Sequence, residues 1–295
     1  MSGTNKRILV IGGTGMLGKP VAEKLQADGF TVRLLARSPE KATRLLGDGY
    51  EIIKGDVDDA DGLKAAMIDV DGVHISLKGG PTAADFDRID YLATRQISQA
   101  AKEMGVERVS ILSAYAVHAD KADSPESKSK LKGETALKSS GVPYTIFRAS
   151  WFMESLPLFV QGKSMPLIGK QIHPLHWIAA KDYARMVANS YKTDETLNKE
   201  LYIFGPEAFT MREAMRIYIQ ITAPNIKIDP ISTKLLYLLG ALSFNTEWKS
   251  MATLMVHYER HGEDGSPEEA NRLLGAPEIR LENWCRERVH GDDGR

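Results

Sequence analysis

Apolar positions in the first half of the chain follow two alternating patterns. Short, continuous apolar runs predict buried strands, and the segments between them, where apolar residues recur every three or four positions, predict helices. The predicted strands cover residues 7–11, 31–36, 50–53, 72–76, 107–112 and 143–147. The predicted helices lie near residues 16–29, 39–47, 60–68, 84–104 and 127–140. This alternation is typical of an α/β fold, a doubly wound parallel sheet with helices on both faces.

The pattern breaks up after about residue 150. Short extended segments are predicted near residues 172–178 and 200–204, and helices near 181–191, 210–222, 232–241, 247–260, 266–274 and 279–289. We therefore expect a sheet domain over residues 1–150, to which segments near 172–205 return. Residues 151–295 are expected to form a smaller, mostly helical lobe that covers the carboxyl edge of the sheet. Gly262 to Gly265 is the segment most expected to be a mobile loop.

A glycine-rich turn follows the first predicted strand. Its sequence is Gly12-Gly13-Thr14-Gly15-Met16-Leu17-Gly18, and a helical pattern begins within it. In this strand-turn-helix context, the backbone of the turn and the N–H groups of the first helical turn are suited to hold a pyrophosphate, and Gly18 lets the helix pack close to the strand. The turn therefore predicts dinucleotide binding. The alternative is an ordinary glycine-rich connection without a ligand.

The ends of the second and third strands bear on which dinucleotide is bound. The second strand ends in Ala36-Arg37-Ser38 and lacks the acid that usually binds the ribose of NAD. Arg37 would pair with a 2′-phosphate and Ser38 would add a hydrogen bond, so we expect NADP(H) in preference to NAD. Alternatively, Arg37 is a solvated charge or stacks on the adenine. At the end of the third strand, Asp56 and Val57 are placed at the adenine, although Asp56 fits equally well as the cap of the next helix.

Composition excludes several classes of protein. The 295 residues are 43% apolar and 26% charged, with a net charge of −1, so nothing favours nucleic acid or a membrane surface. The single cysteine, Cys285, excludes a disulfide framework, and around His173 and His176 we find no spacing typical of a metal site, so no metal is expected. Residues 1–6 carry no apolar signal region, and the apolar stretch 235–244 is too short to span a bilayer. We expect a cytoplasmic protein, monomeric or homodimeric.

These motifs occur in the order seen in a known family. They are GGTGMLG at 12–18, Arg37, Gly55-Asp56-Val57, Leu112-Ser113-Ala114, Lys130 to Glu134 and Gly141 to Arg148. Over about residues 5–215, the chain resembles the NmrA-like group of atypical short-chain dehydrogenases/reductases. The resemblance implies a Rossmann NAD(P)-binding domain with a variable C-terminal substrate lobe. The group includes NADPH-dependent reductases and NADP-binding regulators.

The resemblance also points to Lys130 as a catalytic residue. In the wider superfamily a Tyr-x-x-x-Lys pair on one helix face moves the proton and holds the nicotinamide ribose; here Lys130 matches the lysine, but Glu126 stands where the tyrosine is expected. In reductases of the group that lack the tyrosine, the lysine is thought to act as acid and base. Lys130 is therefore expected to contact the cofactor or to transfer a proton with a lowered pKa. Lys128 or Lys132 facing inward is the alternative.

Other candidate residues lie at neighbouring strand ends. Ser113 is expected to polarise the substrate, or Ala114 takes that position and Ser113 is only a strand-end hydrogen bonder; Tyr115 is a possible replacement hydroxyl or a half-buried aromatic. Leu77 and Lys78, after the fourth strand, are expected to approach the cofactor. Three side chains after the sixth strand either wall an apolar or planar substrate or seal the lobe against the sheet: Trp151, Phe152 and Met153.

The sequence therefore predicts an NADP(H)-binding protein with a small-molecule substrate. The first hypothesis is an oxidoreductase that transfers hydride to a carbonyl, enone or quinone-type compound. The alternative is a non-catalytic, NADP(H)-sensing regulator with a protein partner. Glu126 in place of the tyrosine disfavours a third possibility, a nucleotide-sugar epimerase or dehydratase.

Overall fold

A computed structural model of the chain describes residues 6–243 and 246–292. The outer limits expected for the two domains, residues 1 and 295, lie outside these ranges, as do most of the N-terminal segment 1–6 and Phe244 at the end of the apolar stretch. None of the helices in the described ranges is both long enough and apolar enough to cross a membrane.

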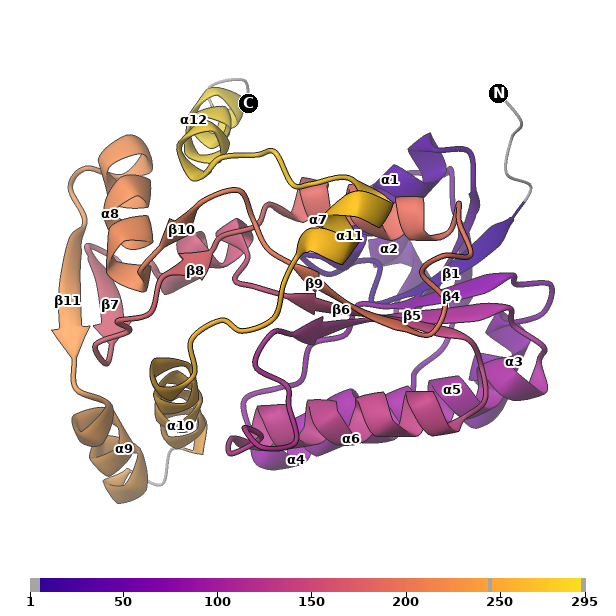
Figure 1. Cartoon of the computed structure of the whole chain (residues 1–295), viewed down its shortest axis with the longest axis horizontal. Helices are drawn as coiled ribbons and strands as arrows, with labels where there is room; N and C mark the ends of the chain where they lie inside the picture. Colours follow the sequence, from indigo (N-terminus) through magenta and orange to yellow (C-terminus); the bar gives the residue numbers. More distant parts are fainter. Residues whose placement is uncertain (1–5, 244–245, 293–295) are drawn as a thin grey trace.

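The centre of the molecule is a sheet of seven parallel strands. Their order is β3-β2-β1-β4-β5-β6-β9. The strands are β1 (Arg7–Ile11), β2 (Thr31–Ala36), β3 (Glu51–Lys54), β4 (Gly72–Ile75), β5 (Arg108–Ala114), β6 (Tyr144–Ala149) and β9 (Lys199–Ile203). The order reverses between β1 and β4, which is where doubly wound sheets open a crevice for ligands. The predicted fold class is confirmed (Figure 1).

Helices cover both faces of this sheet. On one face lie α1 (Gly18–Ala27), α2 (Pro39–Leu46), α7 (Ala180–Ser190) and α11 (Glu268–Leu274). On the other lie α3 (Ala60–Ala66), α4 (Ala83–Phe86), the π-helix η1 (Asp87–Ala93), α5 (Thr94–Glu103) and α6 (Pro125–Ser139). The apolar residues of the strands alternate between these two layers, so the sheet is buried on both sides.

The helix expected over residues 84–104 is interrupted by a π-helical stretch. The widened turns of η1 lie where α6 approaches most closely: a Cβ on Gly133 would lie only 2.1 Å from the carbonyl oxygen of Asp90. A π-helical turn inserts residues into a helix and changes which side chains face a neighbour, a change that apolar periodicity does not reveal. In this chain the buried residue Asp90 faces α6.

The remaining elements form a second layered unit at the carboxyl edge of the sheet (Figure 1). They are the 3-10 helix η2 (Met153–Phe159), β7 (Ser164–Ile168), β8 (Leu175–His176), β10 (Ala208–Phe209), α8 (Met211–Thr222), β11 (Lys227–Ile231), α9 (Thr233–Leu242), α10 (Thr246–Arg260) and α12 (Leu281–Asp292). β7 pairs with β11 in parallel, and β8 pairs with β10 in antiparallel fashion. β7 and β11 were not predicted from the sequence, because each is a short strand whose partner lies about sixty residues away.

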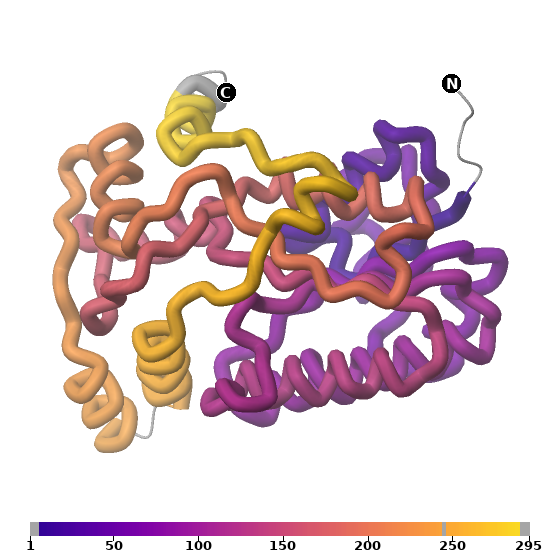
Figure 2. Tube along the Cα trace, viewed as in Figure 1, coloured from indigo at the N-terminus to yellow at the C-terminus, as the bar shows by residue number. Residues whose placement is uncertain are grey.

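The segment Gly262–Gly265 is anchored, whereas the sequence predicted a mobile loop. The Glu263 carboxylate accepts hydrogen bonds from the Ser150 hydroxyl and from the backbone N–H of His176, the latter at 2.8 Å. Asp264 forms an ion pair with Lys121. Beyond this loop the chain returns across the molecule to place α11 on the face formed by α7 and β9 (Figure 2). The glycines correctly indicated a loop, but the side chains of Glu263 and Asp264 hold this loop against its neighbours.

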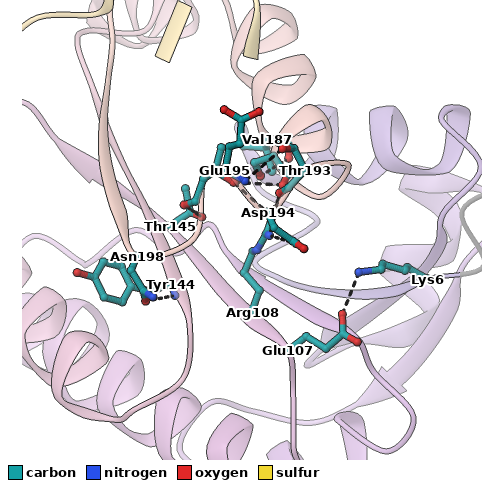
Figure 3. Close-up of polar contacts among 12 residues, drawn as sticks. Lys6, Glu107, Arg108, Tyr144, Thr145, Val187, Thr193, Asp194, Glu195 and Asn198 are labelled. Atoms are coloured by element: carbon teal, nitrogen blue, oxygen red, sulfur yellow. Dashed lines mark hydrogen bonds and ion pairs between the residues drawn. The ribbon is translucent and has the colours of Figure 1, made fainter. Parts of the chain in front are cut away.

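A buried arginine organises the opposite, amino edge of the sheet. Arg108 is 6% exposed, and its guanidinium donates 2.9 Å to the carbonyl of Thr193 and also donates to that of Ser190 (Figure 3). Asp194 adds a charge partner at 3.3 Å. These bonds hold the turn between α7 and β9, so Arg108 sets where the last strand joins the sheet.

We predict that Arg108→Ala lowers the free energy of unfolding by about 2–4 kcal/mol, because it removes a buried side chain together with the charge-assisted hydrogen bonds that hold the turn between α7 and β9. Lys6→Ala is the matched control, since it removes an exposed ion pair with Glu107 at the same edge and costs at most about 1 kcal/mol. Urea unfolding followed by circular dichroism measures both. Equal stability of the two variants would contradict the anchoring role of Arg108.

Candidate functional site

A cleft of about 440 Å³ opens at the carboxyl ends of β1, β4, β5 and β6. Its lining joins the glycine-rich turn, the start of α6, the end of β6 and the middle of α10. Of the residues expected in the site, the cleft brings together Gly12, Thr14, Gly15, Met16, Leu17, Leu77, Lys78, Ser113, Tyr115, Lys130, Trp151 and Phe152. Gly18, Arg37, Ser38, Asp56, Val57 and Met153 lie outside this lining.

The glycine-rich turn has the geometry of a phosphate cradle. Gly12 has φ +86°, and a Cβ there would lie 2.4 Å from the carbonyl oxygen of Ser76, which directly follows the neighbouring strand β4. A Cβ on Gly18 would lie 2.1 Å from the Gly12 carbonyl oxygen, so only glycine lets α1 begin this close to the strand. The backbone N–H groups of Met16 and Leu17 donate to no partner within the described part of the chain. These residues therefore fit a pyrophosphate at the start of α1.

The ends of β2 and β3 continue from the cradle toward the edge of the sheet. Arg37 is exposed and forms no ion pair among the described residues. Ser38 is the N-cap of α2, accepting a hydrogen bond from the N–H of Lys41 at 3.4 Å, and its hydroxyl donates to Glu40 at 3.0 Å. Ser38 is thus engaged within the protein, and Arg37 is the group at this strand end that is open to a phosphate.

Asp56 does not cap the following helix, as one reading of the sequence suggested. That role belongs to Asp59, whose side chain accepts from the N–H of Gly62 at 3.1 Å. Asp56 accepts only a weak backbone bond from Asp58, at 3.3 Å, and is partly exposed at the end of β3. Val57 is buried in the core beside it, so its side chain supports the strand end.

Lys130 is the lysine of α6 that faces inward. Its ammonium donates to Asp90 Oδ1 at 2.7 Å and lies 3.9 Å from Glu126 Oε1. Lys128 and Lys132 are exposed. The contact with Asp90 is possible because Gly133 lets α6 approach η1 backbone to backbone.

The charge balance around Lys130 differs from the expectation. Burial alone would lower its pKa, but the charges of Asp90 and Glu126 and the hydrogen bond to Asp90 hold the pKa above its ordinary value. Burial and the negative charge of Asp90 raise the pKa of Glu126, although Lys130 and Lys78 oppose this. For the protein alone the pKa of Lys130 is therefore raised, where a lowering was expected, because Asp90, which the sequence did not place here, adds its negative charge to that of Glu126.

The Ser113 hydroxyl is directed at Glu134. It donates to Glu134 Oε1 at 2.5 Å, and the other oxygen of that buried carboxylate accepts from Arg148 at 2.7 Å. Of the two readings of Ser113, its geometry agrees with the strand-end hydrogen bonder. Tyr115 is fully buried, where half-burial was expected; its hydroxyl donates weakly to the backbone of His261 at 3.4 Å, and burial raises its pKa strongly.

Aromatic side chains wall the far side of the cleft. The Trp151 ring lies 5.3 Å from that of Tyr258, in an edge-to-face arrangement, and Phe152 packs on Tyr183 at 5.4 Å. Met153 is 1% exposed and belongs to the core of the lobe. The sequence analysis missed Leu254 and Tyr258, because α10 reaches the cleft only through the fold: it packs beside the N-terminal part of α6 (Figure 2).

A histidine pair also escaped the sequence analysis. His257 and His261 are four residues apart at the end of α10, and both bind the carboxylate of Asp123, His261 at 3.4 Å. The ligand atoms lie close enough for one metal ion, but Arg260 also binds this carboxylate, at 3.2 Å, and supplies the positive charge. The cluster links α10 to the segment before α6, and the expected absence of a metal stays a prediction.

Comparisons with known proteins agree with this geometry. Residues 12–173, more than half of the chain, match the family model described as NAD(P)H-binding. The chain is 31% identical over 209 residues to (4-alkanoyl-5-oxo-2,5-dihydrofuran-3-yl)methyl phosphate reductase of Streptomyces griseus, covering 70% of each protein. It is 25% identical over 249 residues to photosystem II assembly factor Ycf39 of Trieres chinensis, covering 82% of this chain and 77% of that protein.

The fold is similar to that of solved reductases. The NADPH complex of the NADPH-dependent quinone oxidoreductase from Escherichia coli superposes with a TM-score of 0.76 and 22% identity, covering 96% of this chain and 99% of that structure. The cradle, the sheet order and the match over residues 12–173 lead to one assignment. The chain belongs to the NAD(P)H-binding family, and the Rossmann fold that it shares with the solved quinone oxidoreductase agrees with its sequence resemblance to the NmrA-like group.

Proposed function

We propose that the protein is an NADPH-dependent oxidoreductase that acts on a small apolar or planar carbonyl, enone or quinone-type compound. The observation that carries this proposal is the single cleft in which the glycine-rich cradle, a buried acid-base group and an aromatic wall meet. A cofactor-sensing protein needs the cradle, but it needs neither of the other two features. The reductases among the relatives and structural neighbours support the same class of reaction.

Each part of the cleft, and of the strand ends beside it, has a task in this reaction. The turn from Gly12 to Leu17 would hold the pyrophosphate, Arg37 the 2′-phosphate, and Asp56 the adenine. Lys130 would bind the nicotinamide ribose, kept in place by Asp90. NADPH, when bound, supplies the hydride. Trp151 and Phe152 would hold a flat substrate and, together with Leu254 and Tyr258, exclude water from it.

The division of the chain follows from these tasks. The dinucleotide domain comprises residues up to about 150, joined by the returning segments near 172–205, of which α7 and β9 lie against or within the large sheet and β8 pairs with β10 of the lobe. The rest, beginning at Trp151, forms the substrate lobe. We propose that the cleft lies between them.

The experiment that tests the function is NADPH oxidation, followed by absorbance, with a panel of quinones, enones and aldehydes. We expect steady turnover with at least one planar acceptor and none without acceptor. NADPH binding with no turnover on any acceptor would contradict the proposal and favour the regulator, a role consistent with an assembly factor among the relatives. In that case, NADPH should change the protease sensitivity of residues 262–265.

Arg37→Ala is predicted to weaken NADPH binding by roughly tenfold to a hundredfold and to leave NADH binding nearly unchanged, because a charge-assisted contact with the 2′-phosphate is lost. Arg44→Ala, which removes an exposed arginine of α2, is the matched control. Calorimetric titration measures both cofactors. An equal loss for NADPH and NADH would rule out a role in choosing between them.

Lys130→Met is predicted to raise the Kd of NADPH at least tenfold, while most of the turnover returns when NADPH saturates the enzyme. This expectation follows from the ribose-binding role, since an interaction made equally before and during the reaction affects binding more than kcat. Lys132→Met, which removes an exposed lysine two residues further along α6, should change neither quantity. A kcat that stays 10²–10⁴-fold low at saturation would instead make Lys130 the proton donor.

A further inference from the structure

Two acids and one base meet at the edge of the cleft. Lys130 Nζ lies 2.7 Å from Asp90 Oδ1 and 3.9 Å from Glu126 Oε1. The direct hydrogen bond of the ammonium therefore goes to Asp90. One ammonium cannot neutralise two carboxylates. Repulsion between the two negative charges therefore favours the protonated form of one carboxyl group.

Glu126 is the acid that faces the cleft. It lines the cavity beside Lys130, and 20% of its side chain is exposed. Within the described ranges its carboxyl group accepts no hydrogen bond, and Lys130 is its nearest cation. Asp90 is 7% exposed and is not part of the lining; one of its oxygens bonds to Lys130 and the other is buried without a partner. Asp90 thus fixes the lysine, and Glu126 is free to meet a ligand.

The surroundings of Glu126 and Lys130 shift their pKa values, and only the shift of Glu126 favours proton donation. A proton donor works best when its pKa is close to the working pH. Burial and the nearby charge of Asp90 raise the pKa of Glu126, so this pKa moves toward neutral pH. Despite burial, the neighbouring carboxylates raise the pKa of Lys130, so this pKa moves further above neutral pH. Environments that separate two groups in this way distinguish the acid from the group that only binds.

We propose that Glu126 is the catalytic proton donor of the cleft and that Lys130, held by Asp90, is a binding and positioning residue. The inference rests on the proposed reductase function. Glu126 stands where the wider superfamily has a tyrosine. The proposal gives the role of proton donor to the carboxyl group of Glu126.

The proposed step balances for a carbonyl or enone substrate. A hydride from NADPH, the reductant, forms a C–H bond at the electron-poor carbon, and the π electrons move to the substrate oxygen. The O–H bond of Glu126 breaks as an O–H bond forms on the substrate, so the product is an alcohol or enol and Glu126 is left as a carboxylate. Solvent returns the proton after the product leaves. The sum is substrate, NADPH and one proton giving reduced product and NADP⁺.

The test uses an enone or aldehyde found in the acceptor panel, with single-turnover rates recorded across pH at saturating NADPH. In the wild type, the rate should be constant at low pH and fall as the pH rises through the pKa of Glu126, because only the protonated acid donates. Glu126→Gln should lower the rate by about 10²–10⁴-fold and abolish this pH dependence, with the Kd of NADPH unchanged within about twofold. Glu126→Asp should restore part of the rate and the pH dependence. Glu103→Gln, at an exposed ion pair, is the matched control.

Two further variants separate Glu126 from Lys130. If Glu126 is the donor, Lys130→Met keeps the pH dependence and shifts it to higher pH, because a positive charge that lowers the pKa of Glu126 is removed. Asp90→Asn shifts it to lower pH, because a negative charge that raises this pKa is removed. Loss of the pH dependence in Lys130→Met, with retention in Glu126→Gln, would overturn the assignment in favour of the lysine.

A second measurement does not depend on turnover. Infrared difference spectra of the protein without cofactor, recorded during a pH titration, should contain a carboxylic acid band that persists above the ordinary range for glutamate and disappears in Glu126→Gln. Its absence would overturn the proposal. A wild type that reduces no acceptor would overturn the reductase function and the donor role together, whereas an active wild type and an equally active Glu126→Gln would overturn the donor role alone.

Discussion

The ion pair between Lys130 and Asp90 is the interaction on which the candidate site depends. A buried ion pair contributes little net stability, because removing two charges from water costs about as much as their attraction returns. Its effect here is geometric. It requires α6 to touch η1, which Gly133 permits by having no side chain, and it holds the start of α6 against the cleft. The position of Glu126, one turn earlier on the same helix, follows from that contact.

A second buried network of hydrogen bonds attaches α6 to the sheet. Glu134, one turn after Lys130, binds Ser113 at the end of β5 and Arg148 at the end of β6. α6 is therefore fixed at two points, one on the neighbouring helix and one on the sheet. Rigid support of this kind is what a proton donor needs, because small displacements of an acid from its substrate reduce the rate strongly.

Local signals explain what the sequence predicted correctly. The strands and the glycine-rich turn depend on periodicity and on neighbouring residues, so they are readable from the local sequence. Lys130 was indicated by the resemblance to a known family, which left Lys128 and Lys132 as alternatives. Asp90 could not be placed, because its orientation depends on the π-helical turns of η1. Tyr258 and the pair of β7 with β11 depend on contacts between residues far apart in the chain, for which one sequence carries no signal. His257 and His261 did carry a signal, their spacing of four, which the sequence analysis overlooked.

The return of the chain after Gly265 has a consequence for how the protein is made. Residues Ala270 and Leu274 of α11 complete the same apolar core as Ile8 and Val10 of the first strand. During synthesis on a ribosome, the core around the first strand therefore cannot close until residues 268–274 have been made. Until then the unfinished sheet exposes apolar surface, which is where chaperones bind nascent chains. The cradle at residues 12–18 is therefore synthesised long before α11, residues 268–274, which completes its support.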